Sequence, residues 1–246
     1  MIYIIVGLVT GLLIGMVGIG GILLAPMLVY IAGIDLHLAM ATSSFSFLFA
    51  GIAGTIAYAR KGTISWKMVG WLSVGVLPGT MLGAKVNVSL PTDILTIILA
   101  ALILSSGIFA LIKKPAIKQE KSRANRIVLV LIGFAVGFGS ALTGTGGPVL
   151  LLPIFLVFSV PTLVAIGVSQ AIQLPIAVFS TLGFTLYGEV DFKLGALLGI
   201  ILAIGVVGGA EIAHRVSAKR LRQIVAIALI AAGLLMIVRV LIPNQI

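Results

Sequence analysis

Two glycine-rich stretches interrupt long apolar runs, and their residue types suit anion binding. The first spans 18–26 and reads Gly-Ile-Gly-Gly-Ile-Leu-Leu-Ala-Pro, and the second spans 144–148 and reads Gly-Thr-Gly-Gly-Pro. Such breaks release backbone N–H and C=O groups, which survive at membrane depth only inside protein or beside a watery cavity. A helix that restarts after a break presents free N–H groups and the positive end of its dipole, an arrangement that binds anions. We therefore expect the two breaks to face one another and to form an anion site.

Candidate substrate-binding residues are the glycines of both breaks and the hydroxyl and amide side chains nearest to them. Such side chains donate hydrogen bonds to an oxyanion without a permanent charge. The alternative interpretation is structural, because Gly-x-Gly-Gly permits close helix packing and buried hydroxyls join neighbouring helices. The predicted site residues are Gly18, Gly20, Gly21, Ser43, Ser44, Thr143, Gly144, Thr145, Gly146, Gly147, Ser169, Gln170 and Gln173.

The composition is that of an integral membrane protein. Hydrophobic residues make up 61% and charged residues 9% of the 246 residues, against about 45–50% and 25% in soluble domains. The net charge of +10 is explained by basic residues that gather in cytoplasmic loops, so no nucleic-acid partner is expected. The chain has no cysteine, and His37 and His214 lie far apart, so neither a metal site nor a cofactor is predicted. The N-terminus lacks the basic region of a cleavable signal peptide.

The chain overlays itself when it is shifted by 126 positions. The matched pairs are Gly18 and Gly144, Gly20 and Gly146, Gly21 and Gly147, Ser43 and Ser169, Gly62 and Gly188, Lys67 and Lys193, Gly79 and Gly205, Gly83 and Gly209, and Gly107 and Gly233. One offset serves all of these pairs. The repeat predicts two homologous halves, residues 1–115 and 125–246, joined by a cytoplasmic linker at 116–124.

Each half contains four apolar segments, and the first of each four is too long for a single crossing. The expected segments are 2–33, 38–59, 66–88 and 93–112, followed by 127–159, 162–187, 192–213 and 221–242. About 20 helical residues span the hydrocarbon, whereas 32 would run about 48 Å. The glycine break lies near the middle of each long segment. The predicted fold is an all-α membrane protein with eight hydrophobic segments, in which the first segment of each half is a glycine-broken helical hairpin.

The distribution of basic residues favours hairpins over full crossings. If both long segments return to their starting side, 13 of the 16 Lys and Arg residues lie on one side, whereas 11 do if both segments cross. The positive-inside rule favours the larger asymmetry. This topology places both termini outside a cell membrane and inverts one half relative to the other, as in many secondary transporters.

Motifs for several other functions are missing. No Gly-x-x-x-x-Gly-Lys-Ser/Thr run is present, and neither a Ser/His/Asp nor an HExxH pattern occurs. The chain is therefore not expected to hydrolyse ATP or to act as an intramembrane hydrolase, and we predict that it is not an enzyme. Glu211 and Lys85 occupy matched positions, where snorkelling to the interface is expected and proton coupling is the alternative.

Longer runs around both breaks resemble a known family. These runs are Gly-Leu-Leu-Ile-Gly-Met-Val-Gly-Ile-Gly-Gly at 11–21 with Ala25-Pro26, the Thr-Ser-Ser entry at 42–44, Gly-Phe-Gly-Ser at 137–140 leading to Gly144–Gly147 and Leu152-Pro153, and Tyr-Gly-Glu-Val-Asp-Phe at 187–192. They are similar to the TauE/SafE family of sulfite exporters, bacterial and archaeal transporters of sulfur-containing anions. The resemblance implies a sulfur oxyanion, such as sulfite or a sulfonate, as cargo.

The expected mechanism is alternating access by one half, or a bundle drawn from both, against the rest. An inside-negative potential favours anion export by about 2.3 kcal/mol per charge per 100 mV, so no second fuel is required, and coupling to protons or sodium stays open. Two alternatives from other classes are an anion-selective channel and a membrane scaffold without cargo. The expected partners are a small anion and the lipid bilayer, and whether the chain forms a homodimer is left open.

Overall fold

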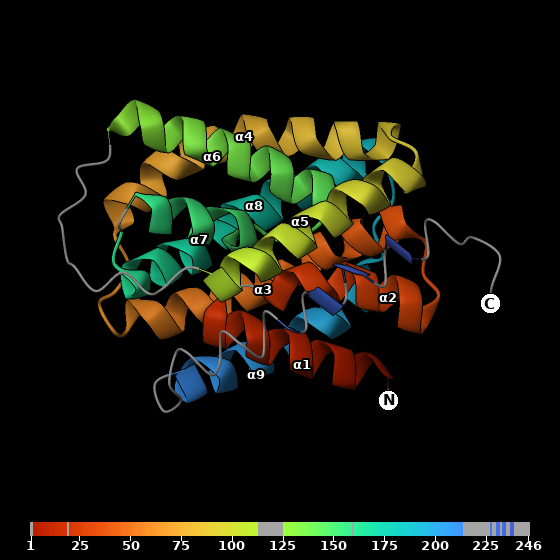
Figure 1. The fold of residues 1–246 in the computed structure, drawn as a ribbon, viewed down its shortest axis with the longest axis horizontal. Coiled ribbons are helices and arrows are strands. Elements are labelled where there is room, and N and C mark those ends of the chain that lie inside the picture. Colours follow the sequence, from red (N-terminus) through yellow and green to blue (C-terminus); the bar gives the residue numbers. More distant parts are fainter. Residues whose placement is uncertain are drawn as a thin grey trace.

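A computed structural model describes residues 2–18, 20–112, 125–158 and 160–213, together with the positions 227, 230, 231, 233, 234, 237 and 238. All elements in these ranges are helices (Figure 1). They are α1 (Ile2–Val17), η1 (Gly20–Leu23), α2 (Leu24–Ala32), α3 (Leu36–Ala59), α4 (Trp66–Ser89), α5 (Thr92–Ile112), α6 (Arg126–Thr143), α7 (Pro148–Val157), α8 (Thr162–Tyr187) and α9 (Phe192–Ala213). Five of the described helices, α3, α4, α6, α8 and α9, are long and apolar enough to cross a membrane.

The helix bounds follow the apolar segments closely. α3 begins two residues earlier than expected because the side chain of Asp35 accepts hydrogen bonds from the backbone N–H groups of His37 and Leu38, at 2.9 and 3.3 Å. Such a cap satisfies N–H groups that have no partner within the helix. The linker 116–124 lies outside the described residues, as does most of the segment 221–242.

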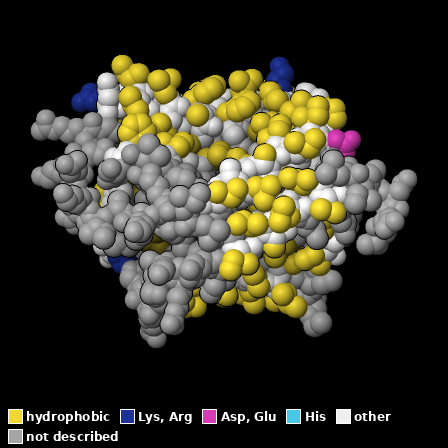
Figure 2. Space-filling model, in the orientation of Figure 1, with side chains coloured by type: hydrophobic (Ala, Val, Ile, Leu, Met, Phe, Trp, Pro, Cys, Tyr) yellow, Lys and Arg dark blue, Asp and Glu magenta, His cyan; other side chains and the backbone are white. Residues whose placement is uncertain are grey.

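The surface suits contact with hydrocarbon. In the face drawn in Figure 2, hydrophobic side chains cover most of the described area, and the charged side chains lie at its margins. Large apolar residues on the long helices, such as Leu131, Leu186 and Ile204, are more than 60% exposed. A soluble monomer rarely exposes apolar patches on this scale, which mark interaction surfaces for membrane or protein.

The chain reverses direction at both glycine breaks. In the first half, the Thr10 hydroxyl of α1 contacts the Met27 sulfur of α2 at 3.7 Å, and a Cβ on Gly20 would lie 2.6 Å from the Thr10 carbonyl oxygen. In the second half, a Cβ on Gly139 of α6 would lie 2.6 Å from Leu150 Cδ1 of α7. Each long first segment is therefore two helices that fold back on one another.

Helices from the N-terminal part of the chain pack closely on helices from the C-terminal part. On α4, a Cβ added to Gly75, Gly79 or Gly83 would collide with a carbonyl oxygen of α6, at Val130, Phe134 and Phe138 respectively. Both series advance by four residues, so α4 and α6 run parallel at the distance that only glycine allows. The equivalent pair is α1 with α9, and Figure 1 shows these two pairs at opposite edges of the molecule with α3 and α8 between them.

The central helices α3 and α8 run in opposite directions. Ser180 donates to the Ser44 hydroxyl at 3.3 Å, a Cβ on Gly51 would lie 3.1 Å from Leu174, and the Thr55 hydroxyl donates to the Gln170 carbonyl at 3.2 Å. As the residue numbers rise along α3, the residue numbers of their contacts on α8 fall, so the two helices are antiparallel. The crossing of these two helices lies beside the glycine breaks and positions the polar residues described next.

Candidate functional site

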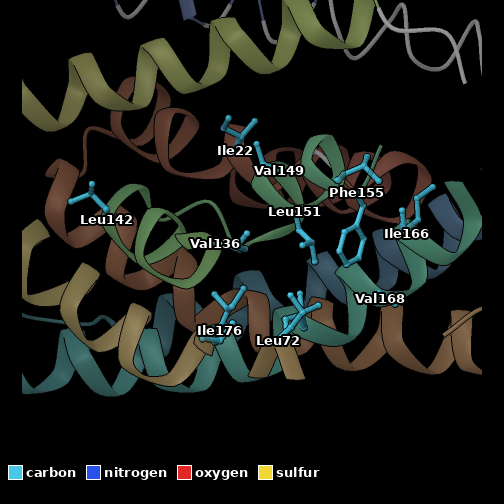
Figure 3. Packing of buried hydrophobic residues seen from close by; sticks show 14 of the residues in the cluster. Ile22, Leu72, Val136, Leu142, Val149, Leu151, Phe155, Ile166, Val168 and Ile176 are labelled. Carbon is cyan, nitrogen blue, oxygen red and sulfur yellow. The ribbon is translucent and has the colours of Figure 1, made fainter. Parts of the chain in front are cut away.

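The two glycine breaks contact each other inside the protein. A Cβ added to Gly21 of the first break would lie 2.8 Å from the Thr145 carbonyl oxygen of the second, and one on Gly18 would lie 3.6 Å from Pro148 Cβ. Ile22 and Val149, which follow the two breaks, belong to one buried cluster and lie beside each other in Figure 3. The expectation that the breaks face one another therefore agrees with the structure.

The ring of Phe47 from α3 contacts both breaks. Its Cζ atom would lie 3.2 Å from a Cβ on Gly21, and its Cδ2 atom 2.8 Å from a Cβ on Gly146. Gly146 and Gly147 have φ angles of +80° and +96°, a region that costs other residues about 1–2 kcal/mol. At the second break, glycine is thus required both by the backbone conformation and by the aromatic ring against it.

The second break leaves backbone N–H groups free at the start of α7. The N–H groups of Gly144 and Thr145 turn back to the Ser140 carbonyl at the end of α6, and those of Leu150 and Leu151 bond to the Gly147 carbonyl. Within the described residues, the N–H groups of Gly146, Gly147 and Val149 have no hydrogen-bond acceptor. These three donors lie at the positive end of the helix dipole, where an anion is stabilised.

Three buried serine hydroxyls also lack a partner in the described part of the chain. Ser43, Ser140 and Ser169 are at most 1% exposed, and their Oγ atoms make no hydrogen bond there. An unpaired buried polar group costs about 1–3 kcal/mol, so each of these hydroxyls requires an explanation.

One of these serines, Ser140, lies directly against the second break, and Ser43 lies on the helix that packs on it. The Oγ atom of Ser140 would be 3.6 Å from a Cβ on Gly147. Ser43 lies on α3 between Met40 and Phe47, which contact Gly144 and Gly146 respectively. Ser169 occupies the position equivalent to Ser43, on α8.

Three other predicted donors lie in the same region but already donate their protons within the protein. The Thr143 hydroxyl donates to the Gly139 carbonyl at 2.6 Å, so the 3.0 Å contact between the Thr143 and Thr145 hydroxyls uses the proton of Thr145. Ser44 donates to the Met40 carbonyl at 2.9 Å. These hydroxyls offer lone pairs rather than free protons.

The two predicted glutamines connect α8 to the first half. The Gln170 amide donates to the Ile14 carbonyl at the end of α1, at 2.9 Å, and the Gln173 amide donates to the Phe47 carbonyl at 3.3 Å. Both Oε1 atoms are buried without a hydrogen-bond donor among the described residues. Gln170 thus holds the end of α1, which precedes the first break, and Gln173 holds α3, whose Phe47 ring contacts both breaks.

Sequence reasoning missed Asn87, the residue that holds the end of α6. Its side-chain amide, fully buried on α4, donates to the Leu142 carbonyl at 2.7 Å and to the Met40 sulfur at 3.1 Å, while its oxygen lies 3.3 Å from His37 Nδ1. An amide inside an apolar span is costly unless it has a role, and this was the available signal.

Ser140, Phe47 and Tyr58 were also missed as site residues. The Tyr58 hydroxyl donates to the Gly15 carbonyl at 3.1 Å and so supports the end of α1. A buried serine, phenylalanine or tyrosine in a helical span is ordinary, so nothing in the sequence distinguished these three from residues that only pack.

The electrostatics of the region are those of neutral dipoles. Among the described residues, every buried polar side chain is a hydroxyl or an amide, and none carries a charge. No group of three or more metal-ligating side chains occurs in that part of the chain. The arrangement can therefore hold an anion by hydrogen bonds and by the α7 dipole.

The chain is similar to known membrane proteins along nearly its whole length. The family model described as "Sulfite exporter TauE/SafE" matches residues 3–236. The chain is 26% identical to the "Probable membrane transporter protein YdhB" of Bacillus subtilis, over 96% of this chain and 100% of that protein. It is 29% identical to a "Probable membrane transporter protein" of Xylella fastidiosa, over 95% and 93%, and 26% identical to MJ0441 of Methanocaldococcus jannaschii, over 95% and 94%. No solved structure matches. The chain therefore belongs to the TauE/SafE sulfite exporter family and is a multi-pass membrane protein of a transporter family.

Proposed function

We propose that this chain is a secondary transporter that exports a sulfur-containing oxyanion, such as sulfite or a sulfonate, by alternating access. The observation that carries the proposal is the contact between the two glycine breaks, where Ser43 and Ser140 and three N–H groups of the α7 start have no partner within the described protein. An oxyanion supplies the acceptors that these buried donors lack.

Two inverted halves, 1–115 and 125–246, form the moving parts in this proposal. The repeat is supported by the spacing of the helices, since α3 and α8 begin 126 residues apart, as do α4 and α9. The inversion is supported by the matched helices α3 and α8, which run antiparallel. Each half also packs against the other, since α1 lies on α9 and α6 lies on α4. An inverted pair of this kind has two equivalent arrangements, which is the basis of alternating access in many transporters.

Transport requires that the contact between the breaks open toward each side in turn. Each break is attached to the opposite half, the first through Gln170 and the second through Asn87. Movement of one half therefore changes the geometry of both breaks together. The inside-negative membrane potential supplies the outward drive for an anion, about 2.3 kcal/mol per charge per 100 mV.

The test measures the flux of sulfite or methanesulfonate across the membrane of proteoliposomes that contain the protein. Gly146→Leu places a side chain on the Phe47 ring, and Gly20→Leu places one against the end of α1; both are expected to abolish flux. Gly62→Leu is the matched control, because Gly62 also has a positive φ, +67°, but no atom lies within 4 Å of its Cβ position. Survival of flux in both site variants contradicts the proposed location of the site.

The same vesicles separate this function from the two alternatives. A transporter accelerates tracer uptake when unlabelled substrate is present on the far side, whereas a channel shows no such counterflow and no saturation. A scaffold gives neither flux nor thermal stabilisation by any sulfur oxyanion. Counterflow with saturation is the expected result.

The membrane orientation completes the proposal. We place both termini outside a cell membrane, with Arg60 and Lys61 on the cytoplasmic side, in accord with the distribution of basic residues. Single cysteines at position 2 and at position 61 of this cysteine-free chain are expected to react with an impermeant thiol reagent from opposite sides. The reverse pattern contradicts the orientation.

A further inference from the structure

We infer that this site selects oxyanions by charge and takes a monovalent species, hydrogen sulfite or an alkanesulfonate, in preference to divalent sulfite or sulfate. The inference rests on the proposed function and specifies which form of the cargo the same site binds. It depends on the nature of the donors and on how deeply they are buried.

The available donors are neutral. Ser43, Ser140 and Ser169 each carry one uncommitted hydroxyl proton in the described structure, and the start of α7 adds the N–H groups of Gly146, Gly147 and Val149. The protons of Thr143, Thr145 and Ser44 are already donated to other groups. The donor set therefore stabilises negative charge through dipoles alone.

The positive partial charge at the second break is smaller than one elementary charge. A helix N-terminus acts as roughly half a positive charge, and α7 begins directly after this break. This partial charge offsets part of one negative charge and leaves the second charge of a dianion uncompensated. At α7, the unpartnered and buried Ser140 hydroxyl lies against Gly147 and provides an independent indication that a ligand is received there.

Deep burial makes the second charge expensive. The three serines are at most 1% exposed, and the cost of removing an ion from water rises with the square of its charge. The free energy of desolvation is thus about four times larger for a dianion than for a monoanion, while the same donors are available to both. Proteins that bind divalent oxyanions tightly commonly use arginine or lysine, and these donors include neither.

Two unpaired acceptors on α8 fit a protonated anion. The Oε1 atoms of Gln170 and Gln173 are buried without a donor in the described part of the protein. The Gln170 oxygen lies against Gly54 of α3, whereas Gln173 occupies the position equivalent to Phe47, the residue between the breaks. An O–H group, as in hydrogen sulfite, satisfies such an oxygen, whereas an alkanesulfonate and a fully ionised dianion both lack this donor, and the dianion is repelled more strongly.

The experiment measures exchange flux of wild-type protein in proteoliposomes at equal pH on both sides and at zero membrane potential. The apparent KM for total sulfite is expected to rise about tenfold per pH unit above the second pKa of sulfurous acid, as hydrogen sulfite is depleted. Methanesulfonate, which does not titrate in this range, serves as the control for titration of the protein, and its KM is expected to stay constant. Sulfate is expected to be neither transported nor inhibitory at concentrations that saturate methanesulfonate flux.

The outcomes separate this inference from the proposed function. A KM for total sulfite that stays flat or falls with rising pH, or sulfate flux equal to methanesulfonate flux, overturns the charge selectivity and leaves the transporter proposal standing. Absence of flux for every sulfur oxyanion at every pH overturns both. Thermal stabilisation of the detergent-solubilised protein by methanesulfonate but not by sulfate is the second readout, and equal stabilisation by the two anions contradicts the inference.

Discussion

The two glycine breaks occupy matched positions in the sequence, yet they are held in different ways. At the first break, Gln170 and Tyr58 donate to two successive carbonyls at the end of α1, Ile14 and Gly15. At the second, Asn87 alone donates to Leu142. The second break also has three glycines with positive φ. The chain thus reverses direction at both breaks, while the supporting contacts differ between them.

This difference indicates which of the two breaks changes its geometry more easily. Ile14 O receives two donors, since Gly18 N–H bonds to it at 2.8 Å as well. Leu142 O is bonded by Asn87 alone among the described residues. The second break has the free N–H groups and three positive-φ glycines, so we expect it to be the more easily altered of the two. The predictions below compare the breaks, from the largest expected effect to the smallest.

Alanine at the glycines is expected to separate the two breaks most clearly. Gly146→Ala adds left-handed strain of about 1–2 kcal/mol and overpacking against Phe47 of about 1–3 kcal/mol, so its free energy of unfolding falls by about 2–5 kcal/mol. Gly20→Ala adds overpacking alone, about 1–3 kcal/mol. Gly62 has a positive φ but open space around its Cβ position. The loss of unfolding free energy in Gly62→Ala therefore measures the backbone strain alone. Unfolding in detergent measures all three, and equal losses at Gly146 and Gly62 contradict the contact with Phe47.

Removal of the amide anchors is expected to have a smaller and unequal effect. Asn87→Leu leaves the buried Leu142 carbonyl without a donor and costs about 1–3 kcal/mol. Gln170→Met leaves Ile14 O bonded to Gly18 N–H, so the loss is about 0.5–1.5 kcal/mol. Hydrogen exchange localises the two effects, with faster exchange near residues 140–147 in the first variant and near 14–18 in the second. The same pattern of exchange in both variants contradicts separate anchoring.

The tyrosine contact is expected to matter least. Tyr58→Phe removes one hydrogen bond to Gly15 O and costs about 0.5–1.5 kcal/mol. The position 126 residues later is already Phe184, which is fully buried in a cluster with Ala84 and Ala141. Phe184→Tyr adds a hydroxyl to this packed cluster and is expected to give no gain in stability. Thermal unfolding compares the two variants, and a gain for Phe184→Tyr contradicts the asymmetry between the breaks.

Much of the helix framework is predictable because membrane segments are constrained by length and hydropathy. α4, α8 and α9 begin at or within one residue of expectation, and the paired glycines mark where α1 and α6 end. The contact between the breaks also follows from the repeat, since polar backbone must be buried together in such a protein.

The particular side-chain contacts do not follow from periodicity. Asn87, Tyr58 and Phe47 contact carbonyls or glycines that are distant in sequence, and only the tertiary structure brings them there. The direction of a hydroxyl proton is equally local: Ser43 and Ser44 are adjacent, yet one is unpaired and the other donates to Met40 O. Sequence therefore predicted the region of the candidate site better than its donors.

The central claim is that the unpaired buried serines, of which Ser140 lies against the second break, receive an oxyanion. Binding of methanesulfonate to single serine variants tests this claim most directly. Ser43→Ala, Ser140→Ala and Ser169→Ala are each expected to keep or gain stability, because each removes an unsatisfied buried hydroxyl. Each is expected to weaken binding by about 10–100-fold, the value of one hydrogen bond to a charged group. Thr181→Val is the matched control, since the Thr181 hydroxyl on α8 is also buried and unpaired in the described structure but lies beyond the residues that contact the breaks. Weaker binding in the three serine variants with unchanged binding in the control is the predicted result. Unchanged binding in all four variants would contradict the account.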